Sequence, residues 1–427
     1  IYALILAYII LKSRFFKIAD MNPMVFVAIF FVKLLAAMAL TWIYTYYYTD
    51  RSTADINKYF DDGKMIFAAF KHHPYDYFRM ITGINSDAPE LRHYYLDCNH
   101  WFKKYDYMMY NDNRTIIRFN AFVMLFSFGN FFVHNVLISF LSLVGLTAIF
   151  KVFASRFPEK RIELLLVIFL LPSTLLWTSA ALKEGLVVFA FGLFFYGVWQ
   201  ILYDKFRIKH LVICITMFYV LILAKYYVIA CAVPGFLFLV LKKYFPNKRS
   251  WILLLSIALF CFAIIISGHL AGGVFDVINT LTYKQNDFVN YSLSLSDVGS
   301  LMDTYKLKPT MFDFIVNSPK ALFNSLFKPL PWDVHNLMAI LPALENVLLL
   351  ILIIACVVYS KKNTKSNTLI IFSLCFVICL NVLNGLIVPV YGALVRYKVP
   401  ALPFLFGILV CIPNFSIGGL FGNKPKE

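Results

Sequence analysis

Residues 23–48 read "PMVFVAIFFVKLLAAMALTWIYTYYY", and this stretch is the clearest indication of the fold class. Its only charged residue is Lys33, and about 20 apolar residues are enough for a helix to cross a bilayer. Similar blocks recur along the 427 residues, of which 61% are hydrophobic and 15% charged. Soluble domains carry about a quarter charged residues. The sequence therefore predicts an all-α polytopic membrane protein.

We predict about eleven transmembrane helices, since each hydrophobic block is close to one crossing in length. They are expected near 1–11, 23–47, 131–152, 162–180, 184–202, 210–225, 226–241, 251–270, 337–359, 367–386 and 398–413. Residues 116–130 are too short for a span, and we expect a re-entrant or interfacial helix there. No repeat is visible, so residues 1–427 are predicted to form a single integrated domain.

Basic residues set the predicted orientation. The net charge of +16 is collected in short segments between the hydrophobic blocks, and the positive-inside rule places such segments in the cytoplasm. They are residues 12–17, 151–161, 203–209, 241–249, 360–365 and 422–427. The positive net charge is thus explained without nucleic-acid binding. The two long hydrophilic stretches, 48–115 and 271–336, then both lie outside, as loops that carry short amphipathic helices.

Cysteine and the first residue add two smaller expectations. Cys98 is the one cysteine in an outer loop, so no disulfide framework is expected there, and no spacing suggests zinc. The chain starts at Ile1 inside an apolar stretch, so we expect its true N-terminus to lie upstream.

The first outer loop opens with "TADINKYFDDGKMIF", residues 53–67, in which three aspartates follow directly on a hydrophobic block. Taken as a helix, residues 55–67 place Asp55, Tyr59 and Asp62 on one stripe, and Asp61 elsewhere. The neighbouring stripe is apolar, with Ile56, Phe60, Gly63 and Phe67. We expect this helix to lie on the outer membrane surface with its aromatic side chains at the lipid boundary. The carboxylates are either a solvated face or part of an active site.

Five basic residues are expected at the same outer level of the membrane, although they are far apart in sequence. A cation that is buried at this level indicates a functional site. The alternative is that each long basic side chain extends to the lipid headgroups and has no functional role. These residues are Arg118, Lys183, Lys225, Lys328 and Arg396. We predict that they bind a phosphate of the substrate.

Four motifs give the chain a family resemblance. They are "ADINKYFDDG" (54–63), "LPSTLLWTSAALKE" (171–184), "LFKPLPWDVHN" (326–336) followed by "ALEN" (343–346), and "YGALVRYKVPALP" (391–403). With them the chain resembles the GT-C superfamily of membrane glycosyltransferases, the class that includes protein O-mannosyltransferases and the lipid A aminoarabinose transferase. Within that class it is most similar to a branch of bacterial inner-membrane proteins.

The resemblance implies an enzyme that moves a sugar from a polyprenyl-phosphate-linked donor to a lipid or glycan acceptor, with its active site facing the periplasm. An aspartate of the first outer loop acts as general base or metal ligand in such enzymes. Carried onto this sequence, that residue is Asp55, with Asp62 second. Residues expected to contact the substrate or its sugar are Tyr59, Glu184, Trp332 and Tyr397.

Two features depart from the family pattern. The paired acidic motif of the metal-dependent oligosaccharyltransferases is absent, which argues against a divalent metal, and no other cofactor is expected. The predicted span at 1–11 is an extra one ahead of the acidic loop.

Three other functions stay open on the sequence alone. A polysaccharide polymerase or ligase of the O-antigen type, using a polyprenyl-pyrophosphate donor, also uses outer arginines and a long outer loop. A flippase for lipid-linked sugars is disfavoured, because transporters tend to carry inverted repeats and charges near mid-membrane. A non-catalytic assembly subunit is the third alternative.

Overall fold

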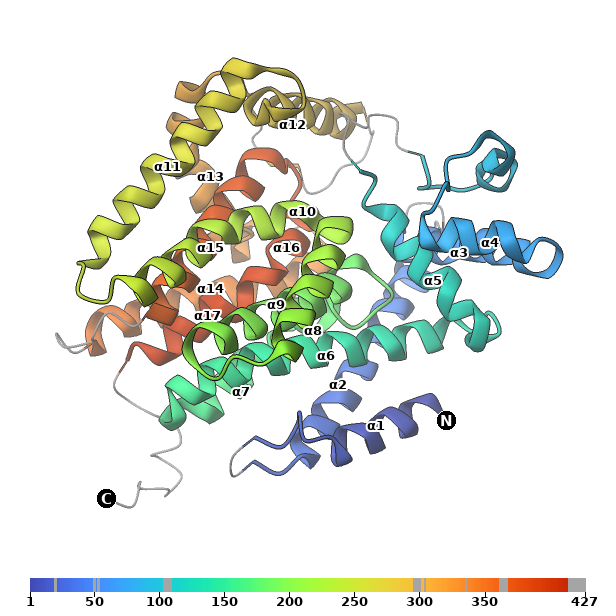
Figure 1. Cartoon of the computed structure of the whole chain (residues 1–427), viewed down its shortest axis with the longest axis horizontal. Coiled ribbons are helices and arrows are strands. Elements are labelled where there is room, and N and C mark those ends of the chain that lie inside the picture. The colour runs from blue at the N-terminus through green and yellow to red at the C-terminus, as the bar shows by residue number, and fades with distance from the viewer. Residues whose placement is uncertain are drawn as a thin grey trace. The chain divides into compact units, whose positions relative to one another are not determined.

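The computed structural model describes residues 1–18, 21–48, 51, 54–102, 110–294, 301–302, 305–334, 336–360 and 368–413. Over these residues the chain is helical, with no β-strand and two isolated bridges (Figure 1). The helices are α1 (Tyr2–Lys12), α2 (Met24–Trp42), α3 (Asp55–His72), α4 (Pro74–Thr82), α5 (Asn113–Ser127), α6 (Phe131–Arg156), α7 (Arg161–Phe169), α8 (Pro172–Trp177), α9 (Lys183–Tyr203), α10 (Ile208–Tyr244), α11 (Ser250–Ala271), α12 (Val277–Ser294), α13 (Met311–Phe327), α14 (Leu337–Tyr359), α15 (Thr368–Ile387), α16 (Tyr391–Tyr397) and α17 (Leu402–Cys411).

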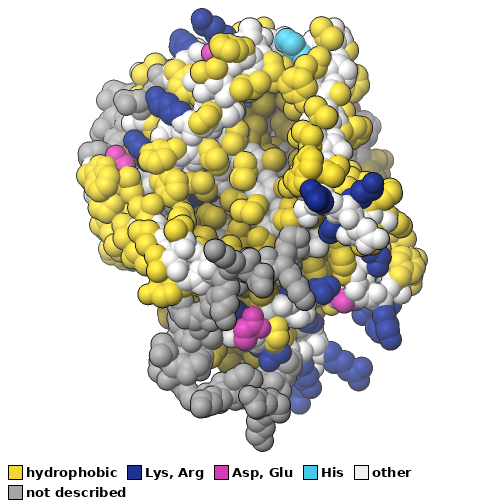
Figure 2. Space-filling view, turned by 90° about the vertical axis from the view of Figure 1, so that its left-hand side faces the viewer, with side chains coloured by type: hydrophobic (Ala, Val, Ile, Leu, Met, Phe, Trp, Pro, Cys, Tyr) yellow, Lys and Arg dark blue, Asp and Glu magenta, His cyan; other side chains and the backbone are white. Residues whose placement is uncertain are grey.

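Eight segments among the described residues are long and apolar enough to cross a membrane. They are Met24–Tyr47, Phe131–Arg156, Lys183–Tyr203, Ile208–Tyr244, Ser250–Ala271, Leu337–Tyr359, Thr368–Ile387 and Tyr391–Cys411. Apolar side chains on several of them face outward, and in α11 Leu259 is 61% exposed. Figure 2 shows hydrophobic side chains over much of one face, with few Lys or Arg side chains in its centre. The chain is an all-α polytopic membrane protein.

Two of the eleven predicted spans are not among these eight. The segment at 1–11 forms α1, an apolar helix of 11 residues, which at 1.5 Å per residue is shorter than the bilayer core of about 30 Å. The segment at 162–180 forms two short helices, α7 and α8. Helix α7 ends where Leu170 leaves helical geometry, two residues before Pro172, whose ring and missing N–H do not suit a helix interior.

The predicted pair of spans at 210–225 and 226–241 corresponds to α10. This helix counts 37 residues, but its backbone leaves helical geometry at Lys225, where φ is −161° and ψ is 81°. A continuous helix of that length would extend about 55 Å, well beyond the bilayer core. The interruption therefore falls at the residue where the sequence predicts a turn between two spans.

The chain divides into two compact units. The first contains residues 1–149, 175–195 and 212–226, and the second contains residues 150–174, 196–211 and 227–427. The prediction of a single integrated domain remains a prediction.

In the first unit, α3 packs along α5. An added Cβ at Gly63 of α3 would lie 2.7 Å from the Cβ of Asn120 in α5, so a side chain there would push the helices apart. Phe60 belongs to the same apolar stripe and contacts Phe131 and His134 of α6, with ring centroids 5.1 and 5.0 Å away. The stripe predicted to meet lipid packs on protein instead, because α5 and α6 offer it an apolar surface.

In the second unit, α13 packs along α15 and the C-terminal helices are deeply buried. Phe404 of α17 contacts Phe372 and Phe376 of α15, with ring centroids 5.9 and 5.4 Å apart. Helix α13 belongs to the second hydrophilic stretch, where Thr310 caps its N-terminus by accepting a hydrogen bond from the backbone of Asp313. The described part of the second hydrophilic stretch, 271–336, thus contains the α-helices α12 and α13.

Candidate functional site

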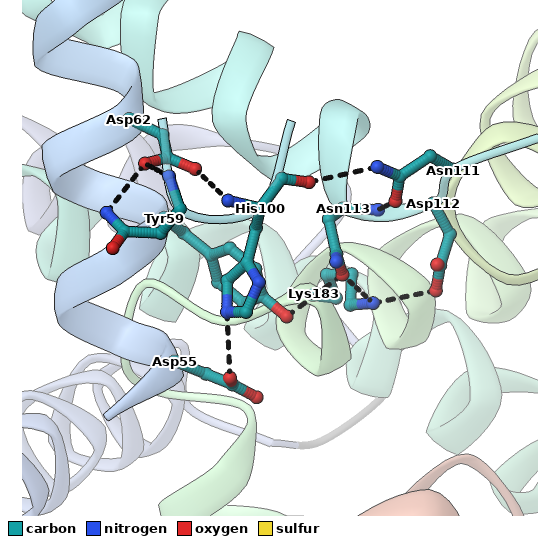
Figure 3. Close-up of polar contacts among 9 residues, drawn as sticks. Asp55, Tyr59, Asp62, His100, Asn111, Asp112, Asn113 and Lys183 are labelled. Carbon is teal, nitrogen blue, oxygen red and sulfur yellow. Dashed lines mark hydrogen bonds and ion pairs between the residues drawn. The ribbon is translucent and has the colours of Figure 1, made fainter. Parts of the chain in front are cut away.

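The helix predicted to open the first hydrophilic stretch is present and begins at Asp55, as expected. Asp61 points away from the stripe of Asp55 and Asp62, and forms an exposed ion pair with Arg51 at 2.7 Å. The other two aspartates face the segment Asn99–Trp101, which returns over α3 (Figure 3). The helix therefore separates its three carboxylates into two environments.

Asp62 is fully buried beneath this returning segment. Its Oδ1 accepts hydrogen bonds from the backbone N–H of Asn99 (2.6 Å) and from the Asn99 side-chain amide (2.9 Å). Its Oδ2 accepts the backbone N–H of His100 at 2.7 Å. A carboxylate that accepts several N–H groups fixes the position of the chain that donates them. Asp62 positions the loop.

Asp55 contacts the imidazole of His100 and is more exposed to solvent than Asp62. Its Oδ1 is 3.3 Å from Nε2 of His100, and the two side chains are 36% and 24% exposed. The His100 ring packs on Tyr59, with centroids 5.3 Å apart. Because Asp55 retains solvent access and Asp62 has none, Asp55 is the carboxylate of this stripe that a substrate could reach.

Lys183 also lies close to Tyr59. Its ammonium is 5.8 Å from the Tyr59 ring centroid and donates hydrogen bonds of 2.7 Å to both Asp112 Oδ2 and Asn113 Oδ1. Tyr59 OH also donates to Asn113 Oδ1, at 3.1 Å. Tyr59 thus links the pair Asp55–His100 to a cation, and Figure 3 shows all these groups together. The lysine charge is balanced in part by Asp112.

Lys225 and Glu184 form a buried ion pair of the first unit. Their side chains are 2% and 0% exposed, and the ammonium lies 2.7 Å from the carboxylate. The pair holds the interrupted point of α10 against the start of α9. Glu184 was predicted to contact sugar and Lys225 to bind phosphate, and here each is a partner of the other.

Arg118 binds the loop around it. Its guanidinium donates hydrogen bonds to the backbone oxygen of Met80 (2.8 Å), to Tyr110 OH (2.7 Å) and to Ser86 Oγ (3.0 Å). It also lies over the ring of Trp101, 5.3 Å from the centroid. These contacts tie α5 to Met80, Ser86 and Trp101 of the first hydrophilic stretch, which also carries His100.

Four predicted site residues belong to the second unit. Lys328 Nζ donates to Tyr391 OH at 3.4 Å, and Trp332 is 75% exposed. Arg396 and Tyr397 lie half-buried in α16. Their predicted convergence with the acidic helix, and phosphate binding by the five basic residues, remain predictions.

Sequence reasoning missed His100, Asn111, Asp112 and Asn113 in the first unit, and Lys398 in the second. Lys398 is 2% exposed and donates to the backbone oxygen of Ser325 (3.3 Å) and to Asn346 Oδ1 (3.1 Å). Its sequence signal was its place in the same motif as Arg396. No sequence signal pairs His100 with Asp55, since 45 residues separate them.

Cys98 and a metal are two further candidates for chemistry at this site. Burial raises the pKa of the Cys98 thiol to about 12, and Asp62 and Asp97 add to that shift, so the thiol is a poor nucleophile. Among the described residues, no group of three or more His, Cys, Asp or Glu side chains could hold a metal ion.

Comparison of the chain with protein-family models, with characterised proteins and with solved structures gives no match in any of the three.

Proposed function

We propose that the chain is a membrane glycosyltransferase. It moves a sugar from a polyprenyl-phosphate-linked donor to a lipid or glycan acceptor, at the outer face of a bacterial inner membrane. The observation that carries this proposal is the solvent-accessible pair Asp55–His100 at the start of α3, with Tyr59 and Lys183 beside it.

Each part of this arrangement matches a requirement of glycosyl transfer. The acceptor hydroxyl must lose a proton as it attacks the sugar, and a carboxylate with a neighbouring imidazole supplies a base. The leaving phosphate gains negative charge, which a nearby cation stabilises. Tyr59 offers an aromatic ring between the two. Asp55 comes eight positions after the apolar segment Met24–Tyr47, which favours a base close to the lipid in which a polyprenyl donor resides.

The interruption of α10 bears on the alternative of a flippase. Transporters place broken helices and charges near mid-membrane. Here residues 208–224 and 226–244 lie on either side of Lys225, and each piece is close to a single crossing in length. An interruption between two such pieces belongs at a membrane surface, where an enzyme for lipid-linked sugars works.

The test compares two aspartates of α3. Membranes with wild type, Asp55→Asn or Asp61→Asn are given polyprenyl-phosphate monosaccharides labelled in the sugar, and labelled product is counted. Asp55→Asn should lower the rate by about 10²–10⁴-fold, the usual contribution of general acid–base catalysis, because it disrupts the pair Asp55–His100 that supplies the base. Asp61→Asn should act like wild type, because Asp61 contacts the exposed Arg51 instead. An Asp55→Asn protein that transfers sugar at the wild-type rate would refute the assignment.

A further inference from the structure

Both backbone polar groups of His100 form hydrogen bonds with side chains, and neither bond involves its imidazole ring. Its N–H donates to the buried Asp62 at 2.7 Å, and its carbonyl oxygen accepts the side-chain amide of Asn111 at 2.9 Å. Asn111 itself is buried and also donates to the backbone oxygen of Trp101 at 2.9 Å. The loop is therefore fixed at this residue.

The ring of His100 is oriented by two neighbours on α3. Nε2 faces Asp55 Oδ1 at 3.3 Å, and the ring face packs on Tyr59. With the hydrogen on Nε2 this contact is a hydrogen bond to the carboxylate, and the lone pair is then on Nδ1. No described residue forms a hydrogen bond with Nδ1, and a quarter of the side chain is exposed (24%).

We propose that His100 is the catalytic base of the transfer and that Asp55 is its positioning residue; this inference rests on the proposed function. The acceptor hydroxyl gives its proton to Nδ1 while its oxygen forms a bond with the anomeric carbon. The bond from that carbon to the phosphate oxygen breaks, and its electron pair leaves with polyprenyl phosphate. The imidazolium then releases its proton to water.

The division of labour follows from the contacts. A carboxylate bonded to one ring nitrogen fixes the tautomer and stabilises the imidazolium, which is the role of aspartate in a Ser-His-Asp triad. Among the described residues, Asp55 contacts the ring directly, Asp62 accepts the backbone N–H of His100, and Lys183 lies 5.8 Å from the centroid of the Tyr59 ring. None of these three residues forms a hydrogen bond with Nδ1.

The experiment uses the full-length protein and the labelled-donor assay. His100→Gln, Asp55→Asn and the double variant are compared with His93→Gln, a control whose imidazole is exposed and contacts the backbone oxygen of Glu90. His100→Gln should lower kcat by about 10²–10⁴-fold with little change in KM. The double variant should be no slower than His100→Gln alone, because the two residues act as a unit.

Two further readouts separate a base from a structural residue. Added imidazole should restore part of the activity of His100→Ala. The contacts to Asp62 and Asn111 use the backbone of residue 100, so the variants should keep the wild-type unfolding temperature.

A rate for His100→Gln near that of wild type, together with an inactive Asp55→Asn, would overturn this inference and make Asp55 the base, while leaving the proposed function in place. An absence of donor turnover by the wild-type protein would remove the proposed function itself.

Discussion

Asp55 and Asp62 lie on one stripe of α3, but they have different surroundings and therefore different roles. Asp62 is fully buried and accepts three hydrogen bonds from Asn99 and His100. Asp55 is open to solvent and contacts an imidazole. The buried carboxylate therefore holds the loop that brings the imidazole to the exposed one.

Replacement of Asp62 should reduce stability. Asp62→Ala leaves the two backbone N–H groups and the amide of Asn99 without their acceptor, and we expect a loss of about 2–4 kcal/mol in the free energy of unfolding. Thermal unfolding in detergent measures this. Asp61→Ala is the control, because exposed ion pairs contribute about 0–1 kcal/mol. Equal unfolding temperatures for Asp62→Ala and Asp61→Ala would show that Asp62 does not hold the loop.

Helical periodicity was sufficient to predict several features of this site. It placed Asp55, Tyr59 and Asp62 on one stripe and Asp61 off it, and the structure agrees. It could not predict His100 or Asn111, because they lie on a loop whose position depends on contacts with residues 37 and more positions away. Such long-range contacts leave no local pattern.

Element boundaries were predictable where hydrophobicity is uniform and less so where proline intervenes. The span at 251–270 and helix α11 nearly coincide, whereas the segment at 162–180 is divided ahead of Pro172. Prediction also assigned the apolar stripe of α3 to lipid, although it packs on α5 and α6. Hydrophobicity shows that a face is buried but does not show what buries it.

Helices α6 and α9 of the first unit approach each other through glycine. An added Cβ at Gly192 would clash with the backbone of Gly145, and small residues allow membrane helices such close contact. Gly192→Ala should therefore lower the free energy of unfolding by about 1–3 kcal/mol, as overpacking does. Gly392→Ala is the matched control, since nothing lies within 4 Å of its added Cβ. If thermal unfolding in detergent shows no difference between the two variants, the close packing of α6 and α9 does not contribute to stability.

Composition was sufficient to predict a membrane protein, because 61% of the residues are hydrophobic and they occur in blocks near twenty residues long, which a soluble protein does not have. The number of spans was less predictable, since α1 is short and the segment of α7 and α8 is interrupted. The orientation rests on the basic segments and the positive-inside rule.

Cleavage of the donor distinguishes a glycosyltransferase from a flippase. The purified protein in liposomes would receive a polyprenyl-phosphate sugar, and both free polyprenyl phosphate and the transbilayer distribution of the intact donor would be measured. We predict that polyprenyl phosphate is released in step with sugar transfer, and that the Asp55→Asn protein releases almost none. Movement of the intact donor across the bilayer without release of polyprenyl phosphate would contradict the proposal.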